Sequence, residues 1–159
     1  MRKAIRVGIK RDEDAKDLPL PNYATEDSSG MDIYAAVDDV VVIAPGEIKL
    51  IPAGFYISIP KGYEAQIRPR SGLALKHGIT LVNTPGTIDA DYRGLVCIIM
   101  TNIGKKPYTI HRGDRIAQMV FTETARAEFE VRDELDRTAR SCGGFGHTGY
   151  TADYRDGEK

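Results

Sequence analysis

The sequence has little of what several protein classes need. Its 159 residues contain two cysteines and no tryptophan, and the formal net charge is −1. Cys97 lies in an apolar run and Cys142 in a glycine-rich stretch, so the pair does not indicate a disulfide framework. A net charge near zero argues against nonspecific attraction to nucleic acid or to a membrane surface. We therefore expect neither as a partner.

Long hydrophobic runs are also missing. No apolar run approaches the roughly 20 residues that a membrane-spanning helix needs. Charged, alternating sequence follows Met1, where a secretory signal would be apolar. We expect a cytoplasmic protein, with a nuclear or organellar location left open.

Several catalytic signatures are absent as well. The sequence has no Gly-x-x-x-x-Gly-Lys-Ser/Thr loop, no Gly-x-Gly-x-x-Gly after a strand and no Gly-x-Ser-x-Gly elbow. The paired Cys-x-x-Cys of the zinc deaminases is missing. The three histidines are scattered, and Cys142 with His147 is too small a set for a zinc site.

What is present is a series of short apolar runs separated by proline and glycine. This spacing predicts one all-β domain, a sandwich or barrel, with little room for crossover helices. We expect strands over 4–10, 31–36, 40–43, 47–51, 55–59, 63–68, 79–82, 95–100, 108–110 and 115–121, and one modest strand within 123–136. One short helix is expected over 69–78, with Ser71 as its N-cap and Gly78 as its C-cap.

Polar groups concentrate between the strands expected at 79–82 and 95–100. Residues 83–94 read Asn-Thr-Pro-Gly-Thr-Ile-Asp-Ala-Asp-Tyr-Arg-Gly, which predicts a hairpin loop. Its amides are free to bond a flat ligand edge, and loops of this kind carry function on a rigid scaffold. Alternatively, Asp89, Asp91 and Arg93 only solubilise the loop and pair with one another.

Three further features each have a structural and a ligand-binding interpretation. Asp32 interrupts an apolar strand, so its carboxylate must be paired, hydrated or close to a cation, and an arginine salt bridge is the simplest solution. Arg70 and Ser71 at a helix start make either a phosphate seat or an ordinary capped turn. The tail around Arg140 and Phe145 is either a flexible terminus or a segment that orders over a ligand.

Taken together, five stretches resemble the motifs of the trimeric deoxyuridine triphosphatase (dUTPase) family. They are Ser29–Ala35, Pro69–Ala74, Gly86–Gly94, Gly113–Val120 and 140–149, and the resemblance runs from about Arg6 to Gly149. It implies a jelly-roll-like all-β subunit and a homotrimer with shared active sites. It also implies hydrolysis of dUTP to dUMP and pyrophosphate with Mg²⁺, which limits uracil in DNA and supplies dUMP for thymidylate synthesis.

The resemblance also implies a role for each motif residue. Asp89 would activate the water that attacks the α-phosphorus, and Tyr92 would exclude a ribose 2′-hydroxyl. Asp32 would hold Mg²⁺ through water. The remaining substrate-binding positions are Asn83, Thr87 and Ile88 for the uracil edge, Arg70, Ser71, Gly72 and Gln118 for the phosphates, and Arg140, Phe145, Gly146, His147 and Thr148 in the tail.

The same resemblance divides the chain. Residues 1–136 would form the β domain, 137–149 a glycine-rich arm that closes the active site, and 150–159 a disordered tail. The arm departs from the usual family motif at two positions, where Ser141 replaces a glycine and His147 replaces a serine.

Three rival interpretations differ in class. A dCTP deaminase shares the fold but uses a glutamate near the base, and residues 83–94 contain none. A non-catalytic binding protein would not need to keep Asp89, Ser71 and Arg140. A purely structural trimer would not need the glycine-rich arm.

Overall fold

The computed structural model describes residues 4–143 of the chain. Residues 4–125 form a compact β domain, and residues 126–143 belong to a second unit in which the described part contains no helix or strand. Within the described residues, no helix has the length and apolar character that a membrane crossing requires.

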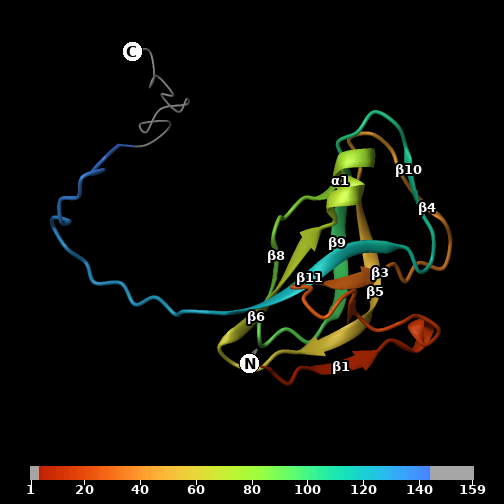
Figure 1. Cartoon of the computed structure of the whole chain (residues 1–159), viewed down its shortest axis with the longest axis horizontal. Coiled ribbons are helices and arrows are strands. Elements are labelled where there is room, and N and C mark those ends of the chain that lie inside the picture. The colour runs from red at the N-terminus through yellow and green to blue at the C-terminus, as the bar shows by residue number, and fades with distance from the viewer. Residues whose placement is uncertain (1–3, 144–159) are drawn as a thin grey trace, which may run out of the picture. The chain divides into compact units, whose positions relative to one another are not determined.

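The β domain consists of two larger sheets and a two-stranded ribbon (Figure 1). The first sheet has the order β1-β5-β9-β7, formed by Gly8–Arg11, Ile48–Ser58, Leu95–Asn102 and Ile79–Leu81. The second has the order β2-β3-β11-β6-β8, formed by Asn22–Tyr23, Met31–Tyr34, Arg115–Glu123, Tyr63–Pro69 and Gly86–Ile88. The ribbon pairs β10 with β4, Tyr108–Ile110 with Val41–Ile43.

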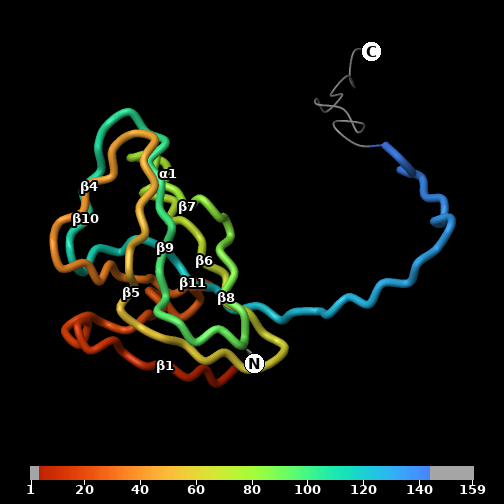
Figure 2. Tube along the Cα trace, turned by 180° about the vertical axis from the view of Figure 1, so that it is seen from behind, coloured from red at the N-terminus to blue at the C-terminus, as the bar shows by residue number. Residues whose placement is uncertain are grey.

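The core lies between the inner faces of the two larger sheets. In β9 every second side chain is buried, which places Val96, Ile98 and Met100 in the core, and β9 runs between β5 and β7 (Figure 2). Ile33 and Ile67 contribute from the second sheet. The all-β prediction and the central position expected for residues 95–100 are therefore confirmed.

One buried position in β9 is polar. Asn102 is fully buried, and its Nδ2 donates to the carbonyls of Ile43, at 2.9 Å, and Lys106, at 2.7 Å. Its Oδ1 accepts from the amide of Gly104 at 2.8 Å. This one amide ties β9 to β4 and to the turn after β9.

The two strands expected at 47–51 and 55–59 are one strand, β5, so the turn predicted between them is wrong. Residues Pro52 to Tyr56 form a register shift against β9, which is a bulge rather than a reversal. Gly54 adopts a φ of 74°, and a Cβ there would lie 2.4 Å from the Cβ of Ala15. Proline and glycine signal turns and bulges alike, so the sequence does not separate the two.

The helix is confirmed, but its start differs from the prediction. The one α-helix among residues 4–143, α1, spans Ser71–His77, and Arg70 is its N-cap, without a side-chain capping bond. Ser71 is therefore the first helical residue rather than the N-cap. Gly78 ends the helix at a φ of 68°, as expected of a C-cap glycine. A short 3-10 helix, η1, spans Glu13–Ala15.

The segment 83–94 is not a simple hairpin loop. β7 and β9 do pair with each other, but the connection between them contains β8, which pairs with β6 in the other sheet. The chain thus leaves the first sheet, adds an edge strand to the second and returns. The modest strand expected within 123–136 is also absent: β11 ends at Glu123, and residues 124–143 are irregular.

Candidate active site

Sheet register brings together polar residues that are far apart in sequence. In the β3–β11 pair Asp32 lies opposite Gln118, and in the β11–β6 pair Ala117 lies opposite Pro69. Because β6 ends at Pro69, the next residue, Arg70, emerges beside Asp32. Three of the predicted site residues therefore meet at one end of the second sheet.

The carboxylate of Asp32 is the centre of this group. Its Oδ1 accepts hydrogen bonds from Arg70 Nε at 3.1 Å and from Gln118 Nε2 at 3.2 Å. Its Oδ2 accepts one from Arg115 Nη1 at 3.1 Å. The Asp32 side chain is only 5% exposed. The arginine salt bridge expected from the sequence is present, and it is doubled by Arg115, which was not predicted.

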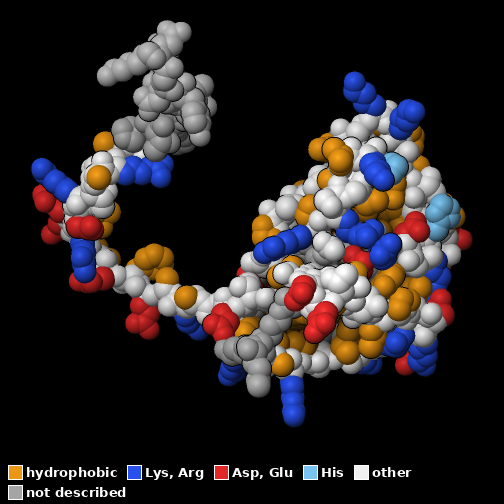
Figure 3. Space-filling view, viewed as in Figure 1, with side chains coloured by type: hydrophobic (Ala, Val, Ile, Leu, Met, Phe, Trp, Pro, Cys, Tyr) orange, Lys and Arg blue, Asp and Glu red, His pale blue; other side chains and the backbone are white. Residues whose placement is uncertain are grey.

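A cleft of about 290 Å³ opens between α1 and Gln118. Its lining is formed by Arg70, Ser71, Gly72, Leu73, Lys76, His77 and Gln118. Lys and Arg side chains gather on the face that carries α1 (Figure 3). Two cations, Arg70 and Lys76, therefore reach one cleft, together with the hydroxyl of Ser71 and the amide of Gln118. This donor set suits phosphate oxygens.

Lys76 is a second residue that the sequence analysis missed. It lies in the last turn of α1 and is exposed, and no ion pair with a carboxylate joins it within the described part of the chain. The adjacent His77 ring contacts the Tyr108 ring at 5.0 Å between centroids. Burial and the charge of Asp114 raise the pKa of Tyr108, against an opposing effect of Arg70.

The segment between β7 and β9 carries the other group of predicted residues. Asn83 lies over Gly86, since a Cβ at Gly86 would come within 3.0 Å of Asn83 Nδ2. Thr87 pairs in register with Gln66 of β6 and is exposed, while the Ile88 side chain is buried in the core. β8 therefore holds the backbone that is expected to meet the base. Its partner is β6, the strand that leads into Arg70.

Asp89 and Tyr92 follow β8 in a tight turn. The amide of Tyr92 donates to the carbonyl of Asp89 at 3.1 Å, and Tyr92 Oη donates to the carbonyl of Leu95 at 2.9 Å. Asp89 is exposed, and within residues 4–143 its carboxylate has no hydrogen-bond or ion-pair partner. A free, exposed carboxylate is available to accept a proton.

Arg93 does not neutralise the carboxylates of this turn. Its Nη1 donates to the carbonyls of Ala90, at 2.8 Å, and Tyr92, at 2.7 Å. The alternative in which Arg93 pairs with Asp89 and Asp91 therefore finds no support in the geometry. The guanidinium closes the turn instead and leaves both carboxylates facing solvent.

The two groups of residues remain separate in one chain. Among the described residues, no hydrogen bond or ion pair links Asp32, Arg70 or Gln118 to the segment from Asn83 to Tyr92. Each group is anchored to β6, which ends at Pro69, just before Arg70, and pairs with β8. The sequence pointed to the members of both groups except Arg115.

Of the predicted site residues in the arm, only Arg140 lies within the described part. Its Nε donates to the carbonyl of Gly143 at 2.9 Å, and the amide of Gly143 donates to the carbonyl of Arg140 at 2.9 Å. Ser141 adopts a φ of 44°, a region that favours the glycine it replaces. The predicted positions Phe145, Gly146, His147 and Thr148 lie outside the described residues.

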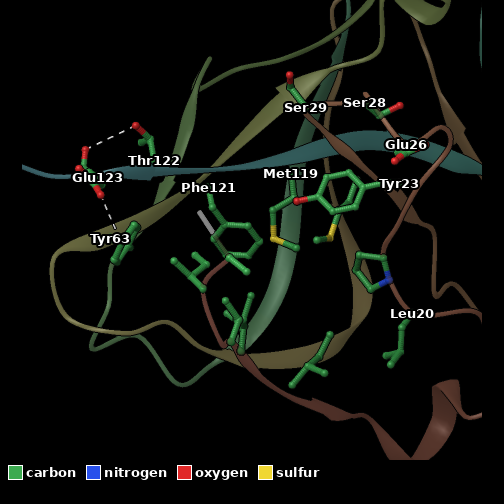
Figure 4. Close-up of a pocket in the computed structure, with 17 residues that line it drawn as sticks. Leu20, Tyr23, Glu26, Ser28, Ser29, Tyr63, Met119, Phe121, Thr122 and Glu123 are labelled. Carbon is green, nitrogen blue, oxygen red and sulfur yellow. Dashed lines mark hydrogen bonds between the residues drawn. The ribbon is translucent and has the colours of Figure 1, made fainter. Parts of the chain in front are cut away.

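A larger hollow lies elsewhere in the β domain. It measures about 1,070 Å³ and is bordered by Leu20, Tyr23, Met119 and Phe121 (Figure 4). It is lined mainly by apolar side chains of the N-terminal segment, β3 and β11. None of the predicted site residues that the structure describes lines it, so volume alone does not mark the candidate active site.

The described residues do not form a metal site by themselves. No group of three or more His, Cys, Asp or Glu side chains within residues 4–143 could hold an ion. Beside the cleft, Asp32 offers a carboxylate oxygen, and its Oδ2 accepts one hydrogen bond, which leaves a lone pair for a water molecule. This donor set fits contact with Mg²⁺ through water and does not fit a site made of protein ligands alone.

Comparison with known proteins gives one consistent answer. The family profile described as dUTPase matches residues 16–149. A protein named deoxyuridine 5′-triphosphate nucleotidohydrolase from Caldanaerobacter subterraneus subsp. tengcongensis is 58% identical over 92% of this chain and 99% of its own. A protein of the same name from Desulfotalea psychrophila is 52% identical over 94% of this chain and 99% of its own.

Solved structures show the same fold. The dUTPase of Staphylococcus bacteriophage 80alpha with dUpNHpp is 25% identical, with a TM-score of 0.82 over 92% of this chain and 100% of that chain. A variant dUTPase of phage phi11 of S. aureus, whose structure concerns the coordination of a structural Mg(II) ion, has a TM-score of 0.73 at 23% identity, over 82% of this chain and 99% of that chain. The predicted dUTPase-like β fold is thus confirmed, and the chain belongs to the dUTPase family.

Proposed function

We propose that this protein hydrolyses dUTP to dUMP and pyrophosphate. The observation that carries the proposal is the 58% identity, over nearly the whole of both chains, to a protein named deoxyuridine 5′-triphosphate nucleotidohydrolase. The residues that such a reaction needs are present. In a cell, the reaction would remove dUTP that could enter DNA and would supply dUMP for thymidylate synthesis.

Asp89 is the proposed general base. Its exposed carboxylate, which has no partner among residues 4–143, takes a proton from a water molecule, whose oxygen forms a bond to the α-phosphorus. The bond between the α-phosphorus and the oxygen that bridges to the β-phosphorus breaks, and pyrophosphate leaves. General-base assistance of this kind typically contributes about 10²–10⁴ in rate.

The segment after β7 provides the proposed nucleoside site. Asn83 and the backbone of Thr87 and Ile88 bond the uracil edge, because β8 fixes that backbone against β6. Tyr92 packs against the sugar at C2′ and leaves no room for a ribose hydroxyl. Its partial exposure, 43%, leaves the ring available to a ligand.

The cleft beside α1 provides the proposed phosphate site. Arg70, Ser71, Gly72 and Gln118 line it and hold the phosphate chain. Asp32 orients Arg70 and Gln118 through the bonds to its Oδ1. In the arm, Arg140 clamps the γ-phosphate and Phe145 stacks on the uracil, with Gly146, His147 and Thr148 beside the phosphates.

Mg²⁺ is the proposed cofactor, carried mainly by the triphosphate. When bound, the ion neutralises charge on the pyrophosphate leaving group. Asp32 is the residue that would contact it, through a coordinated water. The phosphates supply the other ligands, in keeping with the few protein ligands that Mg²⁺ takes in nucleotide sites.

Assembly and location complete the proposal. Within residues 4–143 no hydrogen bond or ion pair joins the nucleoside group to the phosphate group, which suits active sites shared between the subunits of a homotrimer. We propose a β domain over 1–136, an arm over 137–149 that closes a site formed by other subunits, and a tail over 150–159. We also propose an intracellular location, where free cysteines such as Cys97 and Cys142 stay reduced.

Product analysis tests the reaction. Purified protein is incubated with Mg²⁺ and dUTP, dCTP, dTTP or UTP in separate reactions, and the products are separated by chromatography. We expect dUMP and pyrophosphate from dUTP alone. Deoxyuridine products from dCTP would identify a deaminase instead, and dUTP binding without turnover would identify a non-catalytic protein on the same scaffold.

A further inference from the structure

We propose that Gly94 is a specificity-determining residue, which acts by leaving room for the ring of Tyr92. The inference rests on the proposed function, because it concerns how Tyr92 rejects the ribose 2′-hydroxyl. Gly94 itself would not contact the substrate. It is a positioning residue for the side chain that does.

A hydrogen bond from the hydroxyl places the ring of Tyr92. Its hydroxyl donates to the carbonyl of Leu95 at 2.9 Å, and its own amide bonds the carbonyl of Asp89 at 3.1 Å. The residue is 43% exposed, so the core does not fix the ring. To reach the carbonyl of Leu95, three residues further along the chain, the ring must fold back across the backbone at Gly94.

The space above Gly94 is filled by that ring. A Cβ at Gly94 would lie 2.4 Å from Tyr92 Oη, 2.6 Å from Cζ and 3.0 Å from Cε2. Cβ atoms essentially never approach other atoms closer than 3.0 Å. Any side chain at position 94 is therefore incompatible with the observed position of the tyrosine.

The backbone of Gly94 does not itself require glycine. Among the described residues, the glycines with positive φ are Gly46, Gly54, Gly62, Gly78 and Gly113. Gly94 is not one of them, so an alanine could adopt its backbone conformation without strain. The three nearest atoms all belong to the far end of the Tyr92 side chain.

The clash therefore has one easy solution, in which the tyrosine moves. Leu95 begins β9 and lies opposite Tyr56 of β5, so a backbone shift at this point would disturb the first sheet. Displacing a half-exposed ring disturbs one hydrogen bond. Alanine at position 94 should thus move the sugar-facing ring while Asp89, whose carbonyl is held by the backbone amide of Tyr92, stays in place.

Substrate discrimination is the measurement that separates this role from a structural one. The ratio of kcat/KM for dUTP to kcat/KM for UTP is determined for the wild type, Gly94→Ala, Tyr92→Phe, Tyr92→Ala and the Gly94→Ala/Tyr92→Ala double variant. We expect Gly94→Ala to lower the ratio ~10-fold or more, the range for a contact that differs by one small group. Tyr92→Phe keeps the ring and loses the bond to Leu95, so it should lower the ratio by less.

The double variant tests whether Gly94 acts through Tyr92. Without the tyrosine ring, alanine at position 94 has nothing to displace, so it should leave the ratio of Tyr92→Ala unchanged. The inference would be overturned if Gly94→Ala lowered the ratio equally in the wild-type protein and in Tyr92→Ala. It would also be overturned if the ratio of Gly94→Ala equalled that of the wild type. If Gly94→Ala does not fold, Tyr92→Phe provides the test. A ratio of dUTP to UTP turnover in folded Tyr92→Phe that equals the wild-type ratio would show that the bond to Leu95 does not position the ring, and would overturn the inference.

The inference and the proposed function fail in different ways. A wild-type protein that hydrolyses neither dUTP nor UTP overturns both. Wild-type turnover of dUTP together with an unchanged ratio in Gly94→Ala overturns the inference alone.

Discussion

Replacing Asp32 by asparagine should destabilise the protein substantially, because this carboxylate accepts three side-chain hydrogen bonds while it is only 5% exposed. Hydrogen bonds to charged groups are each worth about 1.5–3 kcal/mol. Breaking a fully buried ion pair by removing one partner costs about 3–5 kcal/mol. The two arginines are less buried than that, since the side chains of Arg70 and Arg115 are 26% and 52% exposed.

Solvent therefore reduces the cost. The bond from Arg115 counts for at most about 1 kcal/mol, the upper value for an exposed pair. The bonds from Arg70 and Gln118 to one oxygen carry the larger share, and the amide of asparagine keeps one acceptor for them. We expect a loss of about 2–4 kcal/mol in the free energy of unfolding, close to half the stability of many domains.

The assay is thermal unfolding at one fixed protein concentration, because association shifts apparent stability. For a chain of this size the loss corresponds to a fall in Tm of about 5–15 °C. Asp38→Asn is the matched control, since that carboxylate is 89% exposed and lies 3.6 Å from Arg112. A fall in Tm for Asp32→Asn no larger than for Asp38→Asn would refute the role of Asp32 as the centre of the group.

Three further predictions concern stability. Asn102→Ala should lower the free energy of unfolding, measured by chemical denaturation, by about 1–3 kcal/mol or more, because three backbone groups lose the buried amide that bonds them. A loss under about 0.5 kcal/mol would contradict this. Gly54→Ala should lower Tm more than Gly46→Ala, since both have positive φ but only Gly54 faces close atoms, and equal Tm values would count against the bulge packing. The bidentate bond from Arg112 lowers the pKa of Asp17 to about 2, so the stability that this pair contributes is complete above pH ~4 and is lost as the pH falls toward 2. The difference in unfolding free energy between the wild type and Asp17→Asn, measured across this pH window, should therefore disappear as the pH falls. A difference that stays constant with pH would disprove the prediction.

Local signals in the sequence predicted most of the elements. The apolar run at 95–100 indicated a central strand, and Gly78 marked the end of α1, because hydrophobic period and αL glycines are properties of neighbouring residues. The bulge at Gly54 was predicted as a turn, because proline and glycine signal turns and bulges alike. Whether the chain reverses or only shifts there depends on Ala15 and Ala36, which lie close in space and far in sequence.

The site was predictable as a set of residues and not as an arrangement. The motif resemblance supplied Asp89, Tyr92 and Arg70, and the charged position of Asp32 within an apolar strand indicated a partner. Arg115 and Lys76 were missed, because their relevance depends on strand register and on the cleft beside α1. The pairing of β8 with the second sheet was likewise not predicted, because its partner β6 lies about twenty residues earlier in the chain.

Turnover of dUTP by Asp89→Asn tests the central claim most directly. The variant keeps the shape of the side chain and loses its ability to accept a proton, so kcat should fall at least about a hundredfold. Binding of dUTP, measured separately by calorimetry, should survive, because the phosphate cleft and the base-binding backbone are intact. Near-normal kcat in a folded variant that binds dUTP would contradict the assignment of Asp89 as the base.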